Sequence, residues 1–349
     1  MVGIALLTLV PGALGGTETY TRELLRALAQ DGSLEYRVLL PPVAPSAGEG
    51  LPAQVASSYR SAQTIPERLL AMTEAAVRPR KLQAALRDCD LVHYPLTIRI
   101  PRGLEPSVVT LHDLQHLDLP NLFPRSERLF RRAAWEPSLR GATRIITGSG
   151  FVRDRAVDRL GLDPDTIRVV PFGVDHATFT PGSAEREPYV IYPARAWPHK
   201  NHARLFEAFE LLRMERPELR LVLTGGGTFK AVPAGVDVRG LVAHDELVSL
   251  LQRASALVFP SLYEGFGQPT LEAMACGCPV ACSDVTALPE TVGGAACLFD
   301  PTNVDAIANG IREVLDRPDH WRALGLARAA QFSWSATARG TEAVYRELL

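Results

Sequence analysis

The residues best suited to chemistry lie in one short segment, residues 260–272. It holds two carboxylates, Glu264 and Glu272, eight positions apart. The residues directly after Glu264 are Gly265, Phe266 and Gly267. Glycines let a backbone approach a ligand closely, and the first turn of the helix expected to follow offers unpaired N–H groups to a phosphate. We expect the two carboxylates to hold hydroxyl groups at opposite ends of one ligand; the alternative is two solvated glutamates around a tight turn.

Two cations follow another apolar run. Arg195 and Lys200 come after residues 189–192, which read as a strand. A reaction that expels a diphosphate needs positive charge at the leaving group, and both a guanidinium fork and an ammonium suit phosphate. The charge and geometry of these side chains therefore suit such a group. The alternative is a pair of exposed cations after a strand.

His112 and Asp113 are the candidates in the first half of the chain. They follow residues 108–111, at a strand end where open α/β sheets place ligand sites. Asp113 is expected to orient the imidazole or to serve an acceptor. A structural histidine is one alternative. A metal site formed with His116 and Asp118 is another, and it would need suitable ligand geometry.

Two further positions in this half are weaker candidates. Gly15 and Gly16 stand between a predicted strand and a predicted helix, where they allow a diphosphate to approach or form a plain turn. His93 and Tyr94 end another predicted strand and are placed on the acceptor side, with a structural role as the alternative.

These candidates need a scaffold that gathers strand ends. Short apolar runs alternate with amphipathic stretches, which predicts α/β domains with doubly wound parallel sheets. The expected strands are residues 2–10, 36–40, 91–94, 108–111, 144–147, 167–170, 189–192, 220–223, 236–239, 256–259, 279–282 and 296–299. The expected helices are residues 17–30, 201–215, 244–253, 270–276 and 303–316, with a final helical run over 319–349.

A turn-rich stretch divides the pattern into two domains. We expect a linker at residues 173–187 between an N-terminal domain, 1–172, and a C-terminal domain, 188–330. Residues 1–172 hold 21 basic and 18 acidic residues, a net charge of +3, and residues 173–349 hold 16 and 21, a net charge of −5. The near-zero total gives no global field that favours nucleic acid.

The remaining composition bears on the compartment. The odd number of cysteines, 5, does not resemble a disulfide framework, and the first apolar run has no basic start. These features predict a cytoplasmic protein. Arg125, Arg128, Arg131 and Arg132 could form a basic helix that touches anionic lipid at the inner membrane face; a solvated helix face is the alternative.

Taken in order, the motifs resemble the retaining family-4 glycosyltransferases, which have the GT-B fold. The signature is the Glu264–Glu272 spacing, and the likeness covers nearly the whole chain, most strongly residues 190–300 and least residues 41–90. The other matching segments are residues 15–17, 148–151, 192–195, 199–202, 238–242, 244–251, 256–261, 272–279 and 288–294.

The resemblance implies two Rossmann-like domains facing a central cleft, with the acceptor on the N-terminal domain and a nucleotide sugar on the C-terminal one. The final helix, about 331–349, should return to the first domain. The implied catalytic residues are Glu264, His112, Arg195 and Lys200. The implied donor-binding residues are Gly15, Gly16, Gly265, Phe266, Gly267, Glu272, Val242 and Glu290.

The implied reaction is transfer of a hexosyl group, with retention, to an acceptor hydroxyl and without a metal or other cofactor. Residues 111–123 resemble a stretch of bacterial surface-polysaccharide mannosyltransferases, which favours GDP-mannose as donor, with UDP-hexoses next. The alternatives are a UDP-sugar 2-epimerase of the same fold, a nicotinamide oxidoreductase and a non-catalytic sugar-nucleotide-binding module. The lack of a G-x-G-x-x-G fingerprint weakens the oxidoreductase.

Overall fold

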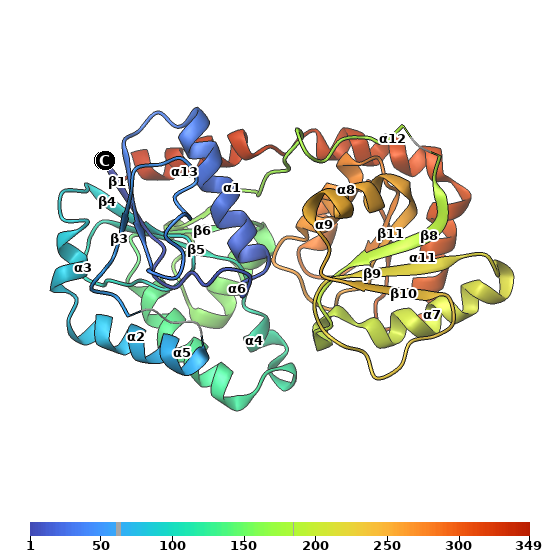
Figure 1. The fold of residues 1–349 in the computed structure, drawn as a ribbon, viewed down its shortest axis with the longest axis horizontal. Coiled ribbons are helices and arrows are strands. Elements are labelled where there is room, and N and C mark those ends of the chain that lie inside the picture. The colour runs from blue at the N-terminus through green and yellow to red at the C-terminus, as the bar shows by residue number, and fades with distance from the viewer. Residues whose placement is uncertain (61–63, 184) are drawn as a thin grey trace. The chain divides into compact units, whose positions relative to one another are not determined.

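The computed structural model describes residues 1–60, 64–183 and 185–349 and contains two compact units (Figure 1). Unit 1 comprises Met1–Gly173 and Trp334–Leu349, and unit 2 comprises Val174–Ser333. Each unit has one parallel sheet with its own helices.

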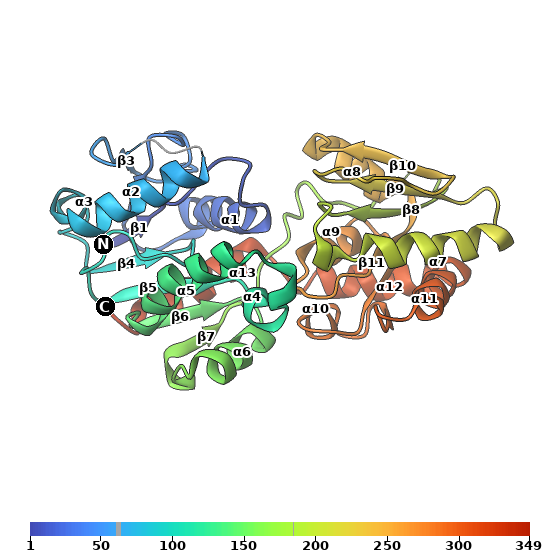
Figure 2. The ribbon, with the colours of Figure 1, turned by 90° about the horizontal axis from the view of Figure 1, so that it is seen from below.

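Unit 1 is built on a seven-stranded sheet in the order β3-β2-β1-β4-β5-β6-β7. Its strands are β1 (Val2–Ala5), β2 (Tyr36–Leu40), β3 (Ala53–Val55), β4 (Leu91–Tyr94), β5 (Ser107–Leu111), β6 (Arg144–Thr147) and β7 (Ile167–Val169). Its helices are α1 (Gly16–Asp31), α2 (Ile65–Val77), α3 (Arg80–Ala84), α4 (Gln115–Asp118), α5 (Arg125–Arg140), α6 (Gly150–Leu160) and α13 (Trp334–Arg346). Helices α1 and α13 cover one face of the sheet, and α2 and α5 cover the other (Figure 2).

Unit 2 repeats this plan on six strands in the order β10-β9-β8-β11-β12-β13. Its strands are β8 (Glu187–Pro193), β9 (Arg220–Thr224), β10 (Val236–Gly240), β11 (Ala254–Phe259), β12 (Val280–Ser283) and β13 (Cys297–Phe299). Its helices are α7 (His202–Glu215), α8 (His244–Arg253), α9 (Gln268–Ala275), α10 (Leu288–Val292), α11 (Val304–Asp316) and α12 (Pro318–Ala329). In both units the first strand along the chain lies in the middle of the sheet, the arrangement of a doubly wound fold.

Several elements differ from their predicted ranges. β1 ends at Ala5 rather than residue 10, because residues 6–10 are apolar but form a largely buried loop. β3 was not predicted, since its three residues are all exposed and carry no apolar alternation. The final helical run divides into α12 and α13.

The predicted linker is part of unit 2 rather than a free connection. Arg186 donates to the main-chain carbonyls of Ala254 and Gly277, and Gln252 donates to the carbonyl of Thr180 at 2.8 Å. The Gly182 Cα lies so close to Gln252 that an added Cβ would be 2.8 Å from that side chain's Cβ. Turn-forming residues in this stretch therefore let the chain follow the surface of unit 2.

Helix α13 is held in unit 1 by a buried carboxylate. Glu342 accepts hydrogen bonds from the Ser33 and Leu34 amides, at 2.6 and 3.2 Å, and from the Tyr36 hydroxyl. Burial alone would raise the pKa of Glu342, but these hydrogen bonds outweigh it and bring the pKa to about 2. The last helix therefore belongs to the unit that begins the chain.

The sequence predicted that four arginines of α5 form one basic face that contacts a membrane. One of these four does not lie on the exposed face. Arg131 is turned inward, with 15% of its side chain exposed, and its guanidinium lies over the rings of Phe123 and Trp135. Arg125 and Arg132 are exposed, and Arg128 is partly buried. Within the described ranges, no helix is long and apolar enough to cross a membrane.

Candidate functional site

The main candidates of unit 2 lie where its strand order reverses. β8 and β11 are neighbours, but their crossovers leave in opposite directions, so the loops after them flank the switch point at which such sheets bind ligands. Arg195 follows β8 directly, and Lys200 ends the short helical turn Pro198–Lys200. Glu264 follows β11. The fold thus brings together Lys200 and Glu264, which are 64 positions apart.

Lys200 and Glu264 form an ion pair across this point. The Lys200 Nζ lies 2.5 Å from a carboxylate oxygen of Glu264, and the two side chains are only 13% and 14% exposed. The ammonium also lies 5.2 Å from the centre of the Phe259 ring. A pair this shielded is weakly screened, so its charges act strongly on whatever binds beside them.

The backbone of Lys200 is fixed by two neighbours to which the sequence analysis assigned no role. The Tyr192 hydroxyl donates to the Lys200 carbonyl at 2.8 Å. Asn201 has a φ of 60°, and its amide donates to the carbonyls of Pro260 and Pro301 at 3.1 and 2.8 Å. Asn tolerates this left-handed conformation better than most residues, so an Asn directly after the lysine was a readable signal.

A glycine run supports the loop that carries Arg195. Gly225 and Gly227 have φ values of 117° and 119°. A Cβ on Gly225 would be 2.7 Å from the Ala194 carbonyl, and one on Gly227 would be 2.6 Å from the Ala196 Cβ. The triple glycine after a predicted strand was a second signal that went unused. The guanidinium of Arg195 lies 5.5 Å from the ring of Trp197.

The segment 260–267 leads into the start of α9. Gly267 is the N-cap of that helix with a φ of 95°, and it offers no side chain to cap the first amides. A Cβ there would lie 2.5 Å from Leu288, so only glycine fits. The Glu264 amide donates to the Thr286 hydroxyl at 3.1 Å, and the Thr291 hydroxyl donates to the carbonyl of Phe266 at 2.5 Å. These bonds fix the loop around Gly265.

The other predicted donor residues of unit 2 lie on three different elements. Glu272 is partly buried on α9, and Val242 is partly buried after β10. Glu290 is exposed on α10, and its main-chain carbonyl accepts from Arg328 at 2.8 Å. Phe266 is buried and packs edge-on against Phe332.

In unit 1, His112 lies directly after β5 and is oriented by a main-chain group. Its Nε2 is 2.8 Å from the Pro95 carbonyl oxygen. A carbonyl can only accept, so Nε2 carries the proton and Nδ1 keeps a lone pair. Burial lowers the pKa of His112 to about 4, although the bond to Pro95 acts in the opposite direction. The ring is therefore neutral near pH 7, and its Nδ1 can accept a hydrogen bond from a hydroxyl group.

Asp113 does not orient this imidazole, as one interpretation of the sequence had it. Its carboxylate accepts from the Gln115 amide at 3.1 Å and lies 3.6 Å from Arg131. The structure also disfavours the alternative of a metal site at His112, His116 and Asp118, because the Asp118 carboxylate pairs with Arg155 and Arg159. Among the described residues, no group of three or more His, Cys, Asp or Glu side chains is placed to hold a metal.

The two acceptor-side candidates at the end of β4 are core residues. His93 is fully buried, with Nδ1 2.7 Å from the Tyr345 hydroxyl and Nε2 2.8 Å from the Thr110 hydroxyl. Tyr94 is also fully buried and donates to the Pro101 carbonyl at 2.6 Å. Neither side chain has surface to offer an acceptor, because both point into the layers between sheet and helices.

Gly15 and Gly16 begin α1. Gly15 is the N-cap with a φ of 56°, and a Cβ added at either glycine would meet no neighbouring atom within 4 Å. The space in front of this helix is therefore open within unit 1. The positive φ of Gly15, rather than crowding by neighbouring atoms, is what favours glycine at this position.

Comparison with known proteins identifies the family of this chain. Residues 14–178 match the model of glycosyltransferase family 4, and residues 175–329 match that of glycosyl transferases group 1. The O-antigen chain mannosyltransferase B of Escherichia coli is 34% identical over 300 residues, which cover 78% of each chain. The chain belongs to the GT-B glycosyltransferases.

Two further likenesses place this glycosyltransferase among its relatives. An MMP alpha-(1->4)-mannosyltransferase of Mycolicibacterium hassiacum is 35% identical over 222 residues, 59% of this chain and 54% of that protein. The structure of a sucrose-phosphate synthase from Thermosynechococcus elongatus superposes with a TM-score of 0.77 at 22% identity, covering 99% and 98% of the two chains. The second likeness concerns the fold alone, and it confirms two Rossmann-like domains.

For a glycosyltransferase, the edge of the unit 2 sheet offers the right kinds of groups. Two cations and the positive dipole end of α9 can stabilise an anionic leaving group. The carboxylate of Glu264, held against Lys200, can accept hydrogen bonds from hydroxyl groups. One loop system thus carries groups suited to a phosphate and groups suited to a polyol.

Proposed function

We propose that this glycosyltransferase moves a mannosyl group from GDP-mannose to an acceptor hydroxyl, with retention at the anomeric carbon. Support for mannose comes from two relatives, one 34% and one 35% identical, which are mannosyltransferases. The observation that carries the place of the donor site is the shielded contact between Lys200 and Glu264 at the switch point of unit 2.

In this proposal, the site residues of unit 2 bind different parts of the donor. Lys200 and Arg195 bind the diphosphate and stabilise its charge as it leaves, together with the positive dipole end of α9. Glu264 holds the sugar and stabilises positive character at the anomeric carbon. Glu272 holds the ribose. Because Lys200 and Glu264 neutralise one another in the unliganded chain, the donor can enter without leaving either charge unpaired.

Unit 1 takes the acceptor, and His112 contacts the transferred sugar. The lone pair on Nδ1 can accept a hydrogen bond from a sugar hydroxyl, and the neutral ring adds no charge to the site. Arg125 and Arg132, which are exposed on α5, make peripheral contact with anionic lipid in this proposal.

The chemical step needs no protein nucleophile in this proposal. The bond between the anomeric carbon and the phosphate oxygen breaks, and the acceptor oxygen bonds to the same face of that carbon. The acceptor proton passes to the leaving phosphate oxygen. No metal is required, since the cations and the helix start supply the positive charge.

Release of nucleotide diphosphate from a panel of GDP, UDP, ADP and TDP sugars tests the donor. GDP-mannose should give the fastest release, with NMR showing an α-linked product. Preference for a UDP-hexose would replace the proposed donor. An inverted product, or a trapped glycosyl-enzyme on the unmodified protein, would refute the mechanism.

Amine labelling tests the proposed contact of Lys200 independently of turnover. The sequence holds three lysines, Lys81, Lys200 and Lys230, so mass spectrometry can follow each one. GDP should protect Lys200 from acetylation, whereas Lys81, which is exposed on α3 in unit 1, should label at an unchanged rate. Equal labelling of Lys200 with and without GDP would refute the contact.

A further inference from the structure

The loop after β4 contains a residue in a strained backbone conformation. Thr97 has a φ of 68°, in the left-handed region that β-branched residues avoid because the Cβ atom crowds the backbone. The residue is buried, with 2% of its surface exposed. Such strain persists only where the surrounding structure holds the residue in place, and it is typical of functional sites. The strain at Thr97 therefore indicates a role beyond closing a turn.

A hydrogen bond ties Thr97 to the neighbouring strand. The Thr97 hydroxyl donates to the main-chain carbonyl of Thr110 on β5 at 2.8 Å. The pairing of β4 with β5 ends at Tyr94 and Val109, so Thr110 lies one residue beyond the last pair of this ladder. Thr110 is itself fully buried in the sheet. The loop of residues 95–98 is thus attached to a fixed point of the sheet through the side chain of Thr97.

The same loop presents the group that orients His112. Pro95 lies two residues before Thr97, and its carbonyl oxygen accepts from the His112 Nε2 at 2.8 Å. The rings of Tyr20 and Phe172 pack against the imidazole, with ring centroids 5.0 and 5.9 Å from it. These rings restrict where the imidazole lies, but within the described part of the chain the Pro95 carbonyl is its one hydrogen-bond partner. This carbonyl therefore decides which ring nitrogen carries the proton.

We propose that Thr97 is a positioning residue for glycosyl transfer, which holds the Pro95 carbonyl in the place that keeps the His112 proton on Nε2. The lone pair on Nδ1 is then available to a hydroxyl group of the transferred sugar. The bond to Thr110 offsets the strain at Thr97, so the carbonyl is in place before the substrate binds. Because Thr97 is buried, it acts through His112 and does not touch the substrate. The inference rests on the proposed function, in which His112 contacts that sugar.

The test replaces Thr97 in the full chain and reads the tautomer of His112 and the rate separately. Thr97→Val keeps the branched side chain and removes only the hydroxyl, whereas Thr97→Ser keeps the hydroxyl. With ¹⁵N-labelled histidine, NMR should show the His112 proton on Nε2 in the parent chain and in Thr97→Ser, and a mixture of both tautomers in Thr97→Val. The signal of His112 is identified by its loss in His112→Gln.

The rate should follow the tautomer. Release of GDP from GDP-mannose at saturating donor should fall at least about tenfold in Thr97→Val and stay near the parent rate in Thr97→Ser, because a displaced imidazole no longer meets the sugar. The affinity for GDP, measured by calorimetry, should not change in either variant, since the proposed function places GDP on unit 2. A merely structural role would not separate the rate from GDP affinity in this way.

Thr21→Val is the matched control. Thr21 is also fully buried in unit 1, and its hydroxyl donates to the main-chain carbonyl of Thr17 at 2.8 Å. This variant should change neither the tautomer of His112 nor the release of GDP.

Two results would overturn the positioning of His112 by Thr97. One is a proton on Nδ1 in the parent chain, and the other is a single Nε2–H tautomer in Thr97→Val. Thr97→Ala, which also lacks the hydroxyl, replaces Thr97→Val if that variant does not fold. Mixed tautomers with the parent rate of GDP release would overturn the part of Thr97 in the transfer, and with it the proposed contact of His112 with the sugar.

Discussion

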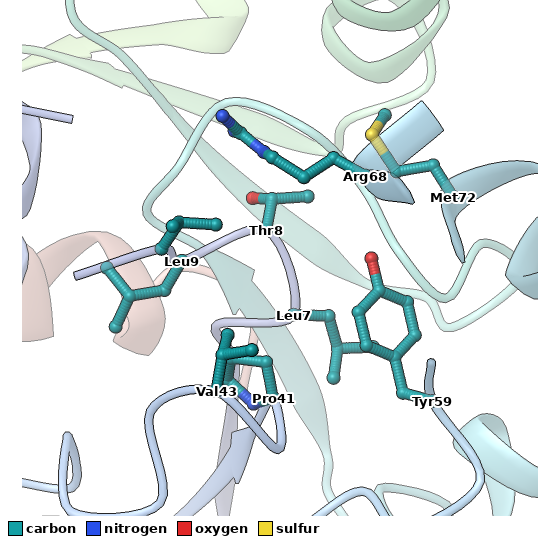
Figure 3. Close-up of a pocket in the computed structure, with 9 residues that line it drawn as sticks. Leu7, Thr8, Leu9, Pro41, Val43, Tyr59, Arg68 and Met72 are labelled. Carbon is teal, nitrogen blue, oxygen red and sulfur yellow. The ribbon is translucent and has the colours of Figure 1, made fainter. Parts of the chain in front are cut away.

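The two units share one strand order and differ at its carboxyl edge. In each, the first strand lies centrally and the chain winds outward in both directions. Unit 2 places a shielded ion pair, Lys200 with Glu264, at the switch point. Unit 1 places a neutral imidazole, His112, after β5, and Arg68 in the lining of a mostly apolar pocket (Figure 3). The same backbone plan therefore presents different side chains at the two edges, and most of these side chains lie on the loops.

Net charge does not explain this difference. Unit 1 holds 23 basic and 20 acidic residues, a net charge of +3, and unit 2 holds 14 and 19, a net charge of −5. The unit assigned to the anionic donor is the more negative one. Binding there must depend on a few cations placed at short range, because more distant exposed charges are screened by salt.

The largest expected effect comes from breaking the ion pair of unit 2. Lys200→Ala and Glu264→Ala should each lower turnover at least about 100-fold, since each removes one preorganised charge from the reacting centre. Initial rates of GDP release at saturating donor measure this.

Lys81→Ala is the matched control, because this lysine is exposed on α3 in unit 1. It should leave turnover unchanged. Near-normal turnover in a Lys200 or Glu264 variant that also unfolds normally would contradict the role assigned to that residue. It would also contradict the contrast drawn between the two sheet edges.

A smaller effect should follow from loosening α13 in unit 1. Glu342→Gln should lower the free energy of unfolding by about 2 kcal/mol, because the bonds from Ser33 and Tyr36 lose their charged acceptor. Urea denaturation at pH 7 measures it. The loss should shrink as the pH of the comparison falls toward 2, where the carboxylate of the parent chain is itself protonated.

Glu347→Gln provides the control for this substitution. Glu347 pairs with Arg144 and Arg168 near the surface, and its side chain is 31% exposed. Its loss should cost less than about 1 kcal/mol. Equal losses for the two variants would show that burial of Glu342 contributes nothing to holding the last helix.

The smallest predicted effect compares the two units in mild acid. In unit 1, burial lowers the pKa of His93 to about 3 and the pKa values of His112 and His116 to about 4. In unit 2, burial lowers the pKa of His202 to about 4. An unfolded chain protonates these rings below about pH 6.5, but the folded units do not until about pH 4. Stability therefore falls as pH falls through this window, and more so in unit 1.

Hydrogen exchange with mass spectrometry can detect that difference. Between pH 7 and pH 6, after correction for intrinsic rates, the protection of unit 1 should fall at least about threefold more than that of unit 2, since each such histidine contributes about a factor of three. His116→Gln should narrow the gap, and the exposed His320→Gln should not. Earlier loss of protection in unit 2 would contradict the comparison.

Much of the fold was predictable because the apolar pattern is strong. The strands around Glu264 and Arg195 begin and end within a few residues of their expected positions, since buried parallel strands read as short apolar runs. β3 and the helices of residues 65–84 were not predicted, because exposed and partly exposed residues there carry little periodicity. Arg131 was placed on the wrong face, since its stacking on Phe123 and Trp135 depends on tertiary contacts.

The sequence by itself determined two doubly wound halves, the Glu264–Glu272 segment and the cations after β8, because each depends on local pattern and composition. Only the tertiary structure decided which of these groups meet. Lys200 reaches Glu264 across 64 positions, His112 is oriented by Pro95, and Thr8, Tyr59 and Arg68 line one pocket from three segments. Such contacts depend on how strand ends are gathered at a sheet edge, which no local pattern encodes.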